Sequence, residues 1–334
     1  MDWLRNPFFL RALELARMSE GFTAPNPPVG AVVVKRGKII GEGRHLCAGF
    51  PHAEVEAIDS CTSNPRGADL YVTLEPCCTH GRTPPCTDLI IRAGIKRVIV
   101  GCSDPNPRHA KKGFDILHKA GIETVLVNCA ECEQLIAPFA KRITTGLPYV
   151  TLKLAMTLDG RIADRKGESK WITSEAAREE VQHLRRRADA VMVGAGTVRT
   201  DDPSLLPRPL TKVPKRIVLG KIPARSKVLT DAHASETIVV SKKQPLRKTF
   251  EELADKGVMH ILCEGGGKLA GSLIDAGLID EYVFFYAPSL FNDAKAVGGM
   301  TGKGFLLKNK PRLRIVEVRQ LPPDVMIRAV RTEG

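Results

Sequence analysis

Short apolar runs alternate with amphipathic segments along the first 130 or so residues. The spacing of apolar side chains predicts a helix over residues 8–20, and the prolines of the 24–30 segment end it. Residues 31–35 and 39–43 predict a β-hairpin that turns at Arg36-Gly37. Further helices are predicted at 52–59, 86–93 and 113–120, and further strands at 70–74, 97–101 and 123–127. Strands that alternate with helices indicate a three-layer α/β domain.

The pattern changes character between Pro138 and Pro148, so we place a domain boundary there and expect domains of residues 1–145 and 146–334. Beyond it, the sequence predicts a helix that Ser174 caps and that runs to about Arg187, and another over 268–276. Apolar runs predict strands at 149–155, 190–193, 216–219, 237–240 and 260–263. This half is therefore a second α/β domain.

Two glycine-rich turns in the second domain follow predicted strands. The turn at residues 265–267 leads into a helix, an arrangement that can bind a phosphate on free backbone N–H groups. Neither this turn nor the one at 194–196 fits the dinucleotide pattern G-x-G-x-x-G. The residues alone indicate one or two anion sites here, and a tight turn explains each run equally well.

Composition narrows the kinds of ligand and the compartment. The 334 residues include 50 Lys and Arg against 37 Asp and Glu, and the net charge of +13 favours nucleic acid, acidic lipid or phosphorylated small molecules. No apolar run is long enough to span a membrane, and Arg11 and Glu14 make the N-terminal segment an amphipathic helix rather than a signal peptide. The nine cysteines lack disulfide-framework spacing, so we expect reduced thiols and a cytoplasmic location.

The strongest chemical signal lies between residues 50 and 88. His52, Cys77 and Cys86 are the ligand types of a zinc deaminase, and Glu54 stands where such an enzyme has its proton-transferring carboxylate. The zinc ion would activate a water for attack on a ring carbon that bears an amino group, and Glu54 would pass a proton to the departing ammonia. Eight residues separate the two thiols, whereas the general signature has two.

A structural zinc site, or buried cysteines without a metal, is the alternative interpretation of these residues. The order and spacing of His52-Ala53-Glu54, Glu75-Pro76-Cys77 and Pro85-Cys86 favour the deaminase. Four other thiols are expected to be small core residues, and the C-x-x-C formed by Cys129 and Cys132 is expected to be coincidental. Those four are Cys47, Cys61, Cys102 and Cys263.

The chain resembles the bifunctional deaminase/reductase of riboflavin biosynthesis. The resemblance is carried in the first domain by residues 25–32, the motifs above, residues 81–86 and Asp104-Pro105-Asn106-Pro107, and in the second by residues 153–161, Trp171-Ile172-Thr173, residues 194–203 and Glu264-Gly265-Gly266. It implies a cytidine-deaminase-like three-layer α/β/α domain followed by a dihydrofolate-reductase-like α/β domain. In that family the wide thiol spacing is usual.

The resemblance also implies functions for individual residues. Asn26, His45 and Arg82 would contact the pyrimidine ribose phosphate, and a guanidinium such as that of Arg82 suits a phosphate. The residues implied for NADPH are Ala155, Trp171, Thr197, Asp201, Gly266, Gly267, Lys268, Leu269, Ala270, Gly271 and Ser272. Those implied for the substrate of the reductase are Lys153, Ser169, Arg185, Leu205, Arg208 and Glu264. Lys153 is a candidate to contact the reacting sugar, and the alternative interpretation is a solvated lysine at a strand edge.

Three departures from the family pattern concern loops. Thr79 and His80 stand where the family has a histidine two residues after the first thiol, residues 108–113 replace a glycine-rich turn, and residues 291–293 replace glycines, where we expect a local loop change.

The sequence therefore predicts an enzyme with two activities. The first domain would deaminate 2,5-diamino-6-(5-phosphoribosylamino)pyrimidin-4-one with zinc, and the second would reduce the ribosyl group of 5-amino-6-(5-phosphoribosylamino)uracil with NADPH. The resemblance implies a homo-oligomer through the reductase domain, and neither nucleic acid nor a membrane is expected as a partner. The alternatives are a zinc deaminase of another base, which predicts C-x-x-C spacing and no matched second domain, and a zinc-stabilised RNA-binding module, which has no need of Glu54.

Overall fold

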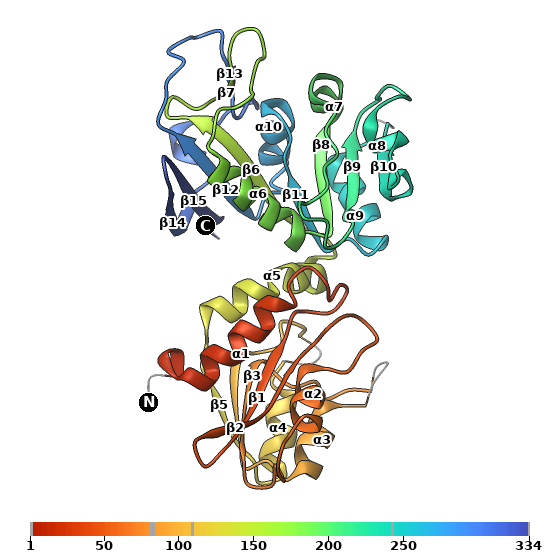
Figure 1. The fold of residues 1–334 in the computed structure, drawn as a ribbon, viewed down its shortest axis with the longest axis vertical. Coiled ribbons are helices and arrows are strands. Elements are labelled where there is room, and N and C mark those ends of the chain that lie inside the picture. Colours follow the sequence, from red (N-terminus) through yellow and green to blue (C-terminus); the bar gives the residue numbers. More distant parts are fainter. Residues whose placement is uncertain (1–2, 81–83, 108–109, 242–243, 333–334) are drawn as a thin grey trace. The chain divides into compact units, whose positions relative to one another are not determined.

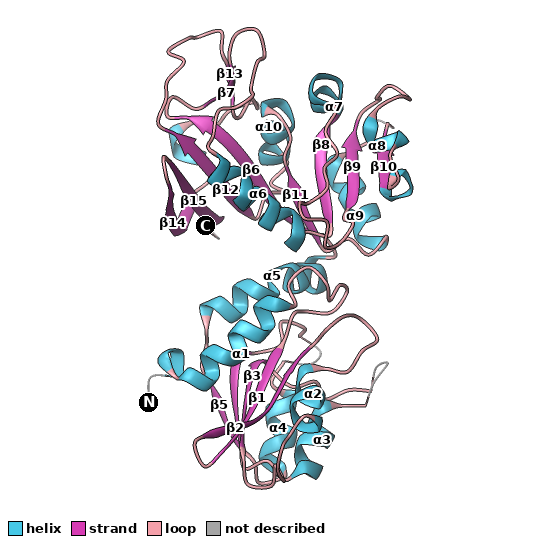
Figure 2. Cartoon of the chain, in the orientation of Figure 1, coloured by secondary structure: helices cyan, strands magenta, loops and turns pink. Residues whose placement is uncertain are grey.

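The computed structural model describes residues 3–80, 84–107, 110–241 and 244–332. The chain divides into two compact units, Met1–Leu147 and Pro148–Gly334. Figure 1 traces their elements along the chain, and Figure 2 separates helix, strand and loop.

The first unit is built around a five-stranded sheet with the order β2-β1-β3-β4-β5. Strand β1 pairs antiparallel with β2 and β3, whereas β3, β4 and β5 run parallel. Helices cover both faces of the sheet, as expected for a three-layer fold (Figure 1). Its elements are α1 (Pro7–Met18), β1 (Gly30–Lys35), β2 (Lys38–Arg44), α2 (Ala53–Asp59), β3 (Asp69–Leu74), α3 (Cys86–Ala93), β4 (Arg97–Cys102), α4 (Lys112–Lys119), β5 (Glu123–Leu126) and α5 (Ala130–Thr145).

Local sequence explains how the helices of this unit begin, end and pack. Asn6 caps α1 by accepting hydrogen bonds from the N–H groups of Phe8 and Phe9, and Gly94 ends α3 in the left-handed conformation (φ 67°). Gly43 allows α2 to lie directly against β2, because a Cβ there would come within 2.3 Å of the Ala53 carbonyl oxygen. This close approach holds the start of α2, which carries His52 and Glu54, against the sheet.

The second unit contains an eight-stranded sheet with the order β10-β9-β8-β11-β6-β12-β15-β14. The strands from β10 to β12 run parallel, and β15 and β14 extend the sheet antiparallel. Its elements are β6 (Tyr149–Thr157), β7 (Arg161–Ala163), α6 (Glu175–Arg187), β8 (Ala190–Gly194), α7 (Ala195–Asp201), β9 (Lys215–Leu219), α8 (Lys227–Thr230), β10 (Thr237–Val240), α9 (Leu246–Asp255), β11 (His260–Cys263), α10 (Gly267–Asp275), β12 (Glu281–Ala287), β13 (Val297–Gly298), β14 (Leu313–Leu321) and β15 (Asp324–Arg331).

The predicted helices and strands are present within about two residues of their expected bounds. Helix α5, which contains Pro138, was not predicted, and one expectation about the cysteines was wrong. Cys47 and Cys61 are only half-buried, whereas Cys102 and Cys263 lie in the core as predicted. Cys129 and Cys132, at the start of α5, are also buried.

Candidate functional site

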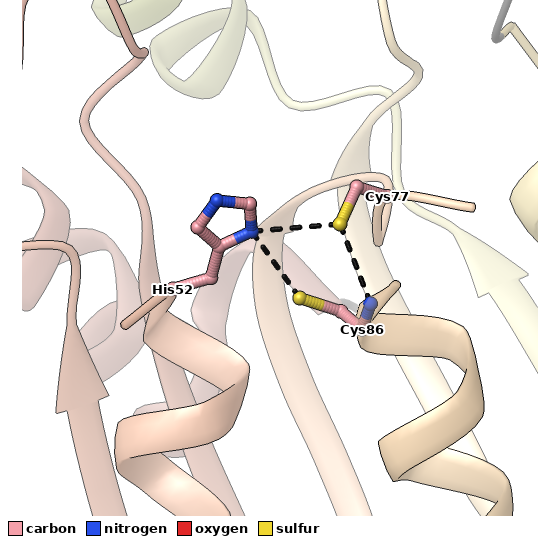
Figure 3. Close-up of side chains that lie close together, drawn as sticks. All are labelled: His52, Cys77 and Cys86. Carbon is pink, nitrogen blue, oxygen red and sulfur yellow. Dashed lines mark hydrogen bonds between the residues drawn. The ribbon is translucent and has the colours of Figure 1, made fainter. Parts of the chain in front are cut away.

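The proposed zinc ligands come from three separate segments of the first unit. His52 is the N-cap of α2, with extended backbone angles (φ −73°, ψ 163°), and Cys86 is the first residue of α3. Cys77 lies in the segment that follows β3. Figure 3 shows the imidazole and both thiols pointing toward one another.

The distances between these side chains fit a tetrahedral zinc site. His52 Nδ1 lies 3.5 Å from Cys77 Sγ and 3.3 Å from Cys86 Sγ, and the three ligand atoms all lie within 4.8 Å of one another. Ordinary zinc–sulfur and zinc–nitrogen bond lengths at a tetrahedral angle place N and S about 3.6 Å apart. The chain thus offers three ligands of the correct types at the correct separation.

The thiols are electrostatically prepared for a cation. A hydrogen bond from the Cys86 thiol, together with contacts to His52, lowers the pKa of Cys77 to about 4 against the effect of burial. The same hydrogen bond and burial raise the pKa of Cys86. The Cys86 N–H also donates to Cys77 Sγ at 3.3 Å. One thiolate therefore forms readily, and a bound cation is needed to stabilise the second.

Glu54 lies in the first turn of α2 beside this group, and its side chain is buried. Burial, and secondarily the negative charge of Cys77, raises the pKa of Glu54 to about 7. A carboxylate with a pKa near neutrality can both accept and release a proton at physiological pH. Because His52 is at the mouth of the helix rather than within it, two residues of separation do not turn Glu54 away from the site.

Asn26 and His45, both predicted to contact substrate, lie together next to the zinc ligands. Asn26 Nδ2 is 3.0 Å from His45 Nε2, and His45 Nδ1 is 2.9 Å from the Pro51 carbonyl oxygen. A proton on Nδ1 satisfies both contacts, and burial lowers the pKa of His45, so the neutral ring is favoured. The His45 and His52 ring centroids are 5.4 Å apart. Arg82, the third predicted contact, lies outside the described residues.

Glu75, in the Glu75-Pro76-Cys77 motif, has a structural role that the sequence did not predict. The buried Glu75 carboxylate accepts hydrogen bonds from the backbone N–H groups of Asp104, Lys111 and Gly113 at 3.0–3.1 Å. It thereby joins the segment that carries Cys77 to the segment that leads into α4. The only sign of this role in the sequence was that Glu75 stands two residues before the proposed ligand Cys77.

The second unit has a compact cluster of charged side chains near the carboxyl ends of its central strands. Arg185 pairs with Glu264 through two hydrogen bonds of 2.6 and 3.0 Å, and a third N–H group donates to the Leu206 carbonyl oxygen at 3.0 Å. The pairing of Leu152 with Cys263 places Lys153 beside Glu264. Burial lowers the pKa of Lys153 although Glu264 opposes this shift. Because β6 is a central strand, the interpretation of Lys153 as a solvated strand-edge lysine was wrong.

The other residues predicted to bind the reductase substrate are less closely grouped. Leu205 is buried with a positive φ of 60°. The Arg208 backbone is held by Gln182 and Arg186, while its side chain is exposed. Ser169 is half-buried in the segment before α6. The structure thus brings together Lys153, Arg185 and Glu264, and places Leu205 near them through the Leu206 contact.

The residues predicted to bind NADPH occupy several elements. Ala155 lies on β6, and Thr197 and Asp201 lie one turn apart on α7. Trp171 is 71% exposed and stacks with the Arg178 guanidinium 4.6 Å from its ring centroid. Lys170 Nζ lies 3.7 Å from Asp201 Oδ1, which links the Trp171 segment to α7.

The predicted stretch from Gly266 to Ser272 forms the start of α10. A Cβ at Gly266 would meet no atom within 4 Å, so the N-cap of the helix is open to a ligand. At Gly271 a Cβ would lie 2.2 Å from the Thr301 carbonyl oxygen, and the Thr301 N–H donates to Gly267. These two glycines are therefore needed for packing of the 298–302 loop, which the sequence did not predict.

Comparison with known proteins shows that each unit matches a known domain family. Residues 4–102 match the cytidine and deoxycytidylate deaminase zinc-binding region, and residues 148–327 match the RibD C-terminal domain. The chain is 43% identical to the riboflavin biosynthesis protein RibD of Bacillus amyloliquefaciens, over 97% of this chain and 95% of that protein. The chain belongs to the RibD family.

Other members of the RibD family agree in sequence and in structure. The RibD protein of Escherichia coli (strain K12) is 38% identical over 97% of this chain and 98% of that protein. A structure of Acinetobacter baumannii RibD matches with a TM-score of 0.86 at 38% identity, over 98% of both chains. A Thermotoga maritima diaminohydroxyphosphoribosylaminopyrimidine deaminase/5-amino-6-(5-phosphoribosylamino)uracil reductase matches with a TM-score of 0.86 at 36% identity, over 97% of this chain and 98% of that chain.

These matches confirm the predicted family, the two-domain α/β fold class and an enzyme of riboflavin biosynthesis with deaminase and reductase activities. They do not favour another deaminase or an RNA-binding module. Within the described part of the chain, no helix has the length and apolar character needed to cross a membrane.

Proposed function

We propose that the first unit, within the predicted domain 1–145, hydrolytically removes the ring amino group of 2,5-diamino-6-(5-phosphoribosylamino)pyrimidin-4-one. The convergence of His52, Cys77 and Cys86 beside the buried Glu54 supports this proposal. Zinc held by these ligands would supply an acidified water and a Lewis acid. Glu54 takes up a proton from the attacking water and delivers it to the leaving amino group. Asn26 and His45 orient the substrate.

We also propose that the second unit, within the predicted domain 146–334, reduces the ribosyl group of 5-amino-6-(5-phosphoribosylamino)uracil to ribityl. The cluster of Lys153, Arg185 and Glu264 supports substrate binding at this end of the sheet. NADPH would supply the hydride, and the open start of α10 and the α7 residues Thr197 and Asp201 would hold it. The Lys153 ammonium is placed to donate a hydrogen bond or a proton to the sugar oxygen.

Replacement of Glu54 by Gln tests the deaminase assignment. We expect ammonia release from the diaminopyrimidine substrate to fall by about a hundredfold to ten-thousandfold, because the amide cannot transfer the proton. Oxidation of NADPH by the deaminated substrate should persist. Glu56→Gln, two residues along the same helix, is the matched control and should deaminate normally. Retained deamination by Glu54→Gln would exclude the mechanism, and wild-type protein that fails to oxidise NADPH would exclude the reductase assignment.

Assembly and location are further parts of the proposal. The edge strand β14 exposes Ile315 and Val318 by 60% and 61%, which supports a homo-oligomer formed through the reductase unit. Sedimentation of the wild type and of Ile315→Lys tests this, and a monomeric wild type would refute it. All nine cysteines are unpaired, which supports the predicted cytoplasmic location.

A further inference from the structure

Strand β9 carries an arginine whose side chain has no exposed surface. Arg216 is the second residue of this strand. Its guanidinium donates two hydrogen bonds of 2.6 and 2.9 Å to the Asp231 carboxylate, directly after α8, and one of 3.0 Å to the Val228 carbonyl oxygen. A buried ion pair is often no more stabilising than apolar residues of similar volume. Stability of the fold is therefore a weak explanation for this arginine.

The same guanidinium reaches the segment that follows α7. Arg216 Nη1 donates a hydrogen bond of 3.3 Å to the Ser204 carbonyl oxygen. On the other side of Leu205, the Leu206 carbonyl oxygen accepts the 3.0 Å hydrogen bond from Arg185 Nη1. The two carbonyl groups that flank Leu205 are therefore each bound by an arginine.

Leu205 has a backbone conformation that requires support. Its φ is +60°, in the left-handed region that residues with a side chain rarely adopt, and Asp202 three residues earlier has φ +40°. The Leu205 side chain is buried in the apolar cluster that includes Val198 and Val218. Such a conformation persists only where the surrounding structure fixes it, and residues of this kind are concentrated at functional sites.

The two arginines connect Leu205 to different parts of the second unit. Arg185 also pairs with Glu264, which lies beside Lys153, so the Leu206 carbonyl group is linked to the proposed substrate cluster. Arg216 links the Ser204 carbonyl group to β9 and to the end of α8. Without Arg216, the Leu205 segment would be attached to the cluster from one side only and could relax toward an ordinary φ.

We infer that Arg216 is a positioning residue of the reductase site, which holds the Ser204 carbonyl group so that Leu205 keeps the conformation that binds the ribosyl substrate. The inference rests on the proposed reductase function and on Leu205 as a substrate contact. Because Arg216 has no exposed surface, it acts through this segment and does not touch the substrate. Its loss therefore weakens substrate binding, which raises KM, more than it slows hydride transfer.

Replacement of both charges tests this inference without leaving one of them buried alone. In Arg216→Met combined with Asp231→Asn, we expect KM for 5-amino-6-(5-phosphoribosylamino)uracil to rise by about tenfold to hundredfold, the usual effect of one hydrogen bond to a charged group. The kcat and the KM for NADPH should stay within about threefold of wild type. Steady-state NADPH oxidation measures all three values, and thermal unfolding measures stability.

Arg328→Met combined with Glu281→Gln is the matched control, because it removes another largely buried ion pair of the same unit. It should lower the melting temperature and leave the KM for the ribosyl substrate unchanged. Arg216→Lys is the conservative variant, since an ammonium keeps the charge beside Asp231 but lacks the planar fork of donors. Its KM should lie between those of wild type and the double variant, and it also tests the inference if the double variant does not fold.

The outcomes separate the inference from the function on which it rests. An unchanged KM for the ribosyl substrate in either Arg216 variant would overturn the inference, as would an equal rise in the control. Wild-type protein that fails to oxidise NADPH with this substrate would instead contradict the proposed reductase function.

Discussion

The two units organise their charged groups in opposite ways. In the first, two thiols, an imidazole and the Glu54 carboxylate gather within a small volume, and negative charges repel one another there. In the second, the opposite charges of Arg185 and Glu264 compensate each other, and Lys153 lies beside this pair. The deaminase site thus needs a bound cation to reach its working state, whereas the reductase site leaves only the Lys153 ammonium uncompensated once the chain has folded.

Removal of one proposed zinc ligand is the strongest test of this difference. Cys86→Ala should reduce bound zinc from about one per chain to near zero and lower ammonia release by about a thousandfold or more, because the site loses its metal-activated water. NADPH oxidation by the deaminated substrate should stay within twofold of wild type. Metal analysis together with both assays measures these effects.

Cys78→Ala is the matched control, since it removes a half-buried thiol adjacent to the ligand Cys77. It should keep its zinc. A Cys86→Ala protein that retains stoichiometric zinc, or that loses both activities in parallel, would contradict the separation between the units.

The grouping of the proposed zinc ligands could be predicted from the sequence because these residues stand in short motifs. His52 and Glu54 are two residues apart, and Cys77 and Cys86 each follow a proline in the same region. The helix starts that present His52 and Cys86 depend on local sequence, so the geometry followed from the order of elements.

The surroundings of Lys153 could not be predicted in this way. Its neighbour Glu264 lies on the strand end that β6 meets only when the sheet is assembled, and the sequence contains no local sign of that pairing. Helix α5 escaped prediction for a different reason. Residues 138–148 were assigned to the domain boundary, whereas α5 contains Pro138 and continues to Thr145. Long-range strand order and tertiary context therefore account for what the sequence did not predict.

Breaking the Arg185–Glu264 pair tests whether this ion pair stabilises the second unit without a bound ligand. Glu264→Gln leaves a buried guanidinium without its counter-charge, so we expect a loss of about 3–5 kcal/mol in the unfolding free energy of the second unit. Urea unfolding followed by circular dichroism measures this change, because Glu264 is also a proposed substrate contact, and deamination should persist at the lower urea concentrations. Glu251→Gln, which breaks an exposed pair with Arg247, should have little effect. Equal stabilities of the two variants would show that the pair does not support the fold.

Acid should weaken the second unit through a histidine that the fold keeps neutral. His260 lies within hydrogen-bond distance of the Thr151 hydroxyl, which donates to Glu281, and burial lowers the pKa of His260 to about 4. The unfolded chain takes up this proton near pH 6.5 and the folded chain only near pH 4. This contribution to stability is therefore present above pH 6.5 and is lost as the pH falls toward 4, by about 3 kcal/mol at most.

Thermal unfolding of wild type and His260→Gln between pH 7 and pH 4.5 isolates that contribution, because all other titrating groups are shared. The variant should lose less stability over this range. His183→Gln, an exposed histidine on α6, should behave as wild type, and identical pH slopes in all three proteins would rule out His260 as the cause.

Replacement of Lys153 separates a functional charge from a structural one. Burial lowers the pKa of both Lys153 and Lys212, so each ammonium is held in the folded unit against a desolvation cost. Lys153→Met should lower kcat/KM for ribosyl reduction by about a hundredfold, because the substrate loses a charged hydrogen-bond donor, while the melting temperature stays the same or rises. Lys212→Met removes the counter-charge of Asp189 and should lower the melting temperature while kcat/KM changes little. If both variants lose stability and activity to the same extent, Lys153 supports the fold rather than the reaction, and the second site is an ordinary charged cluster.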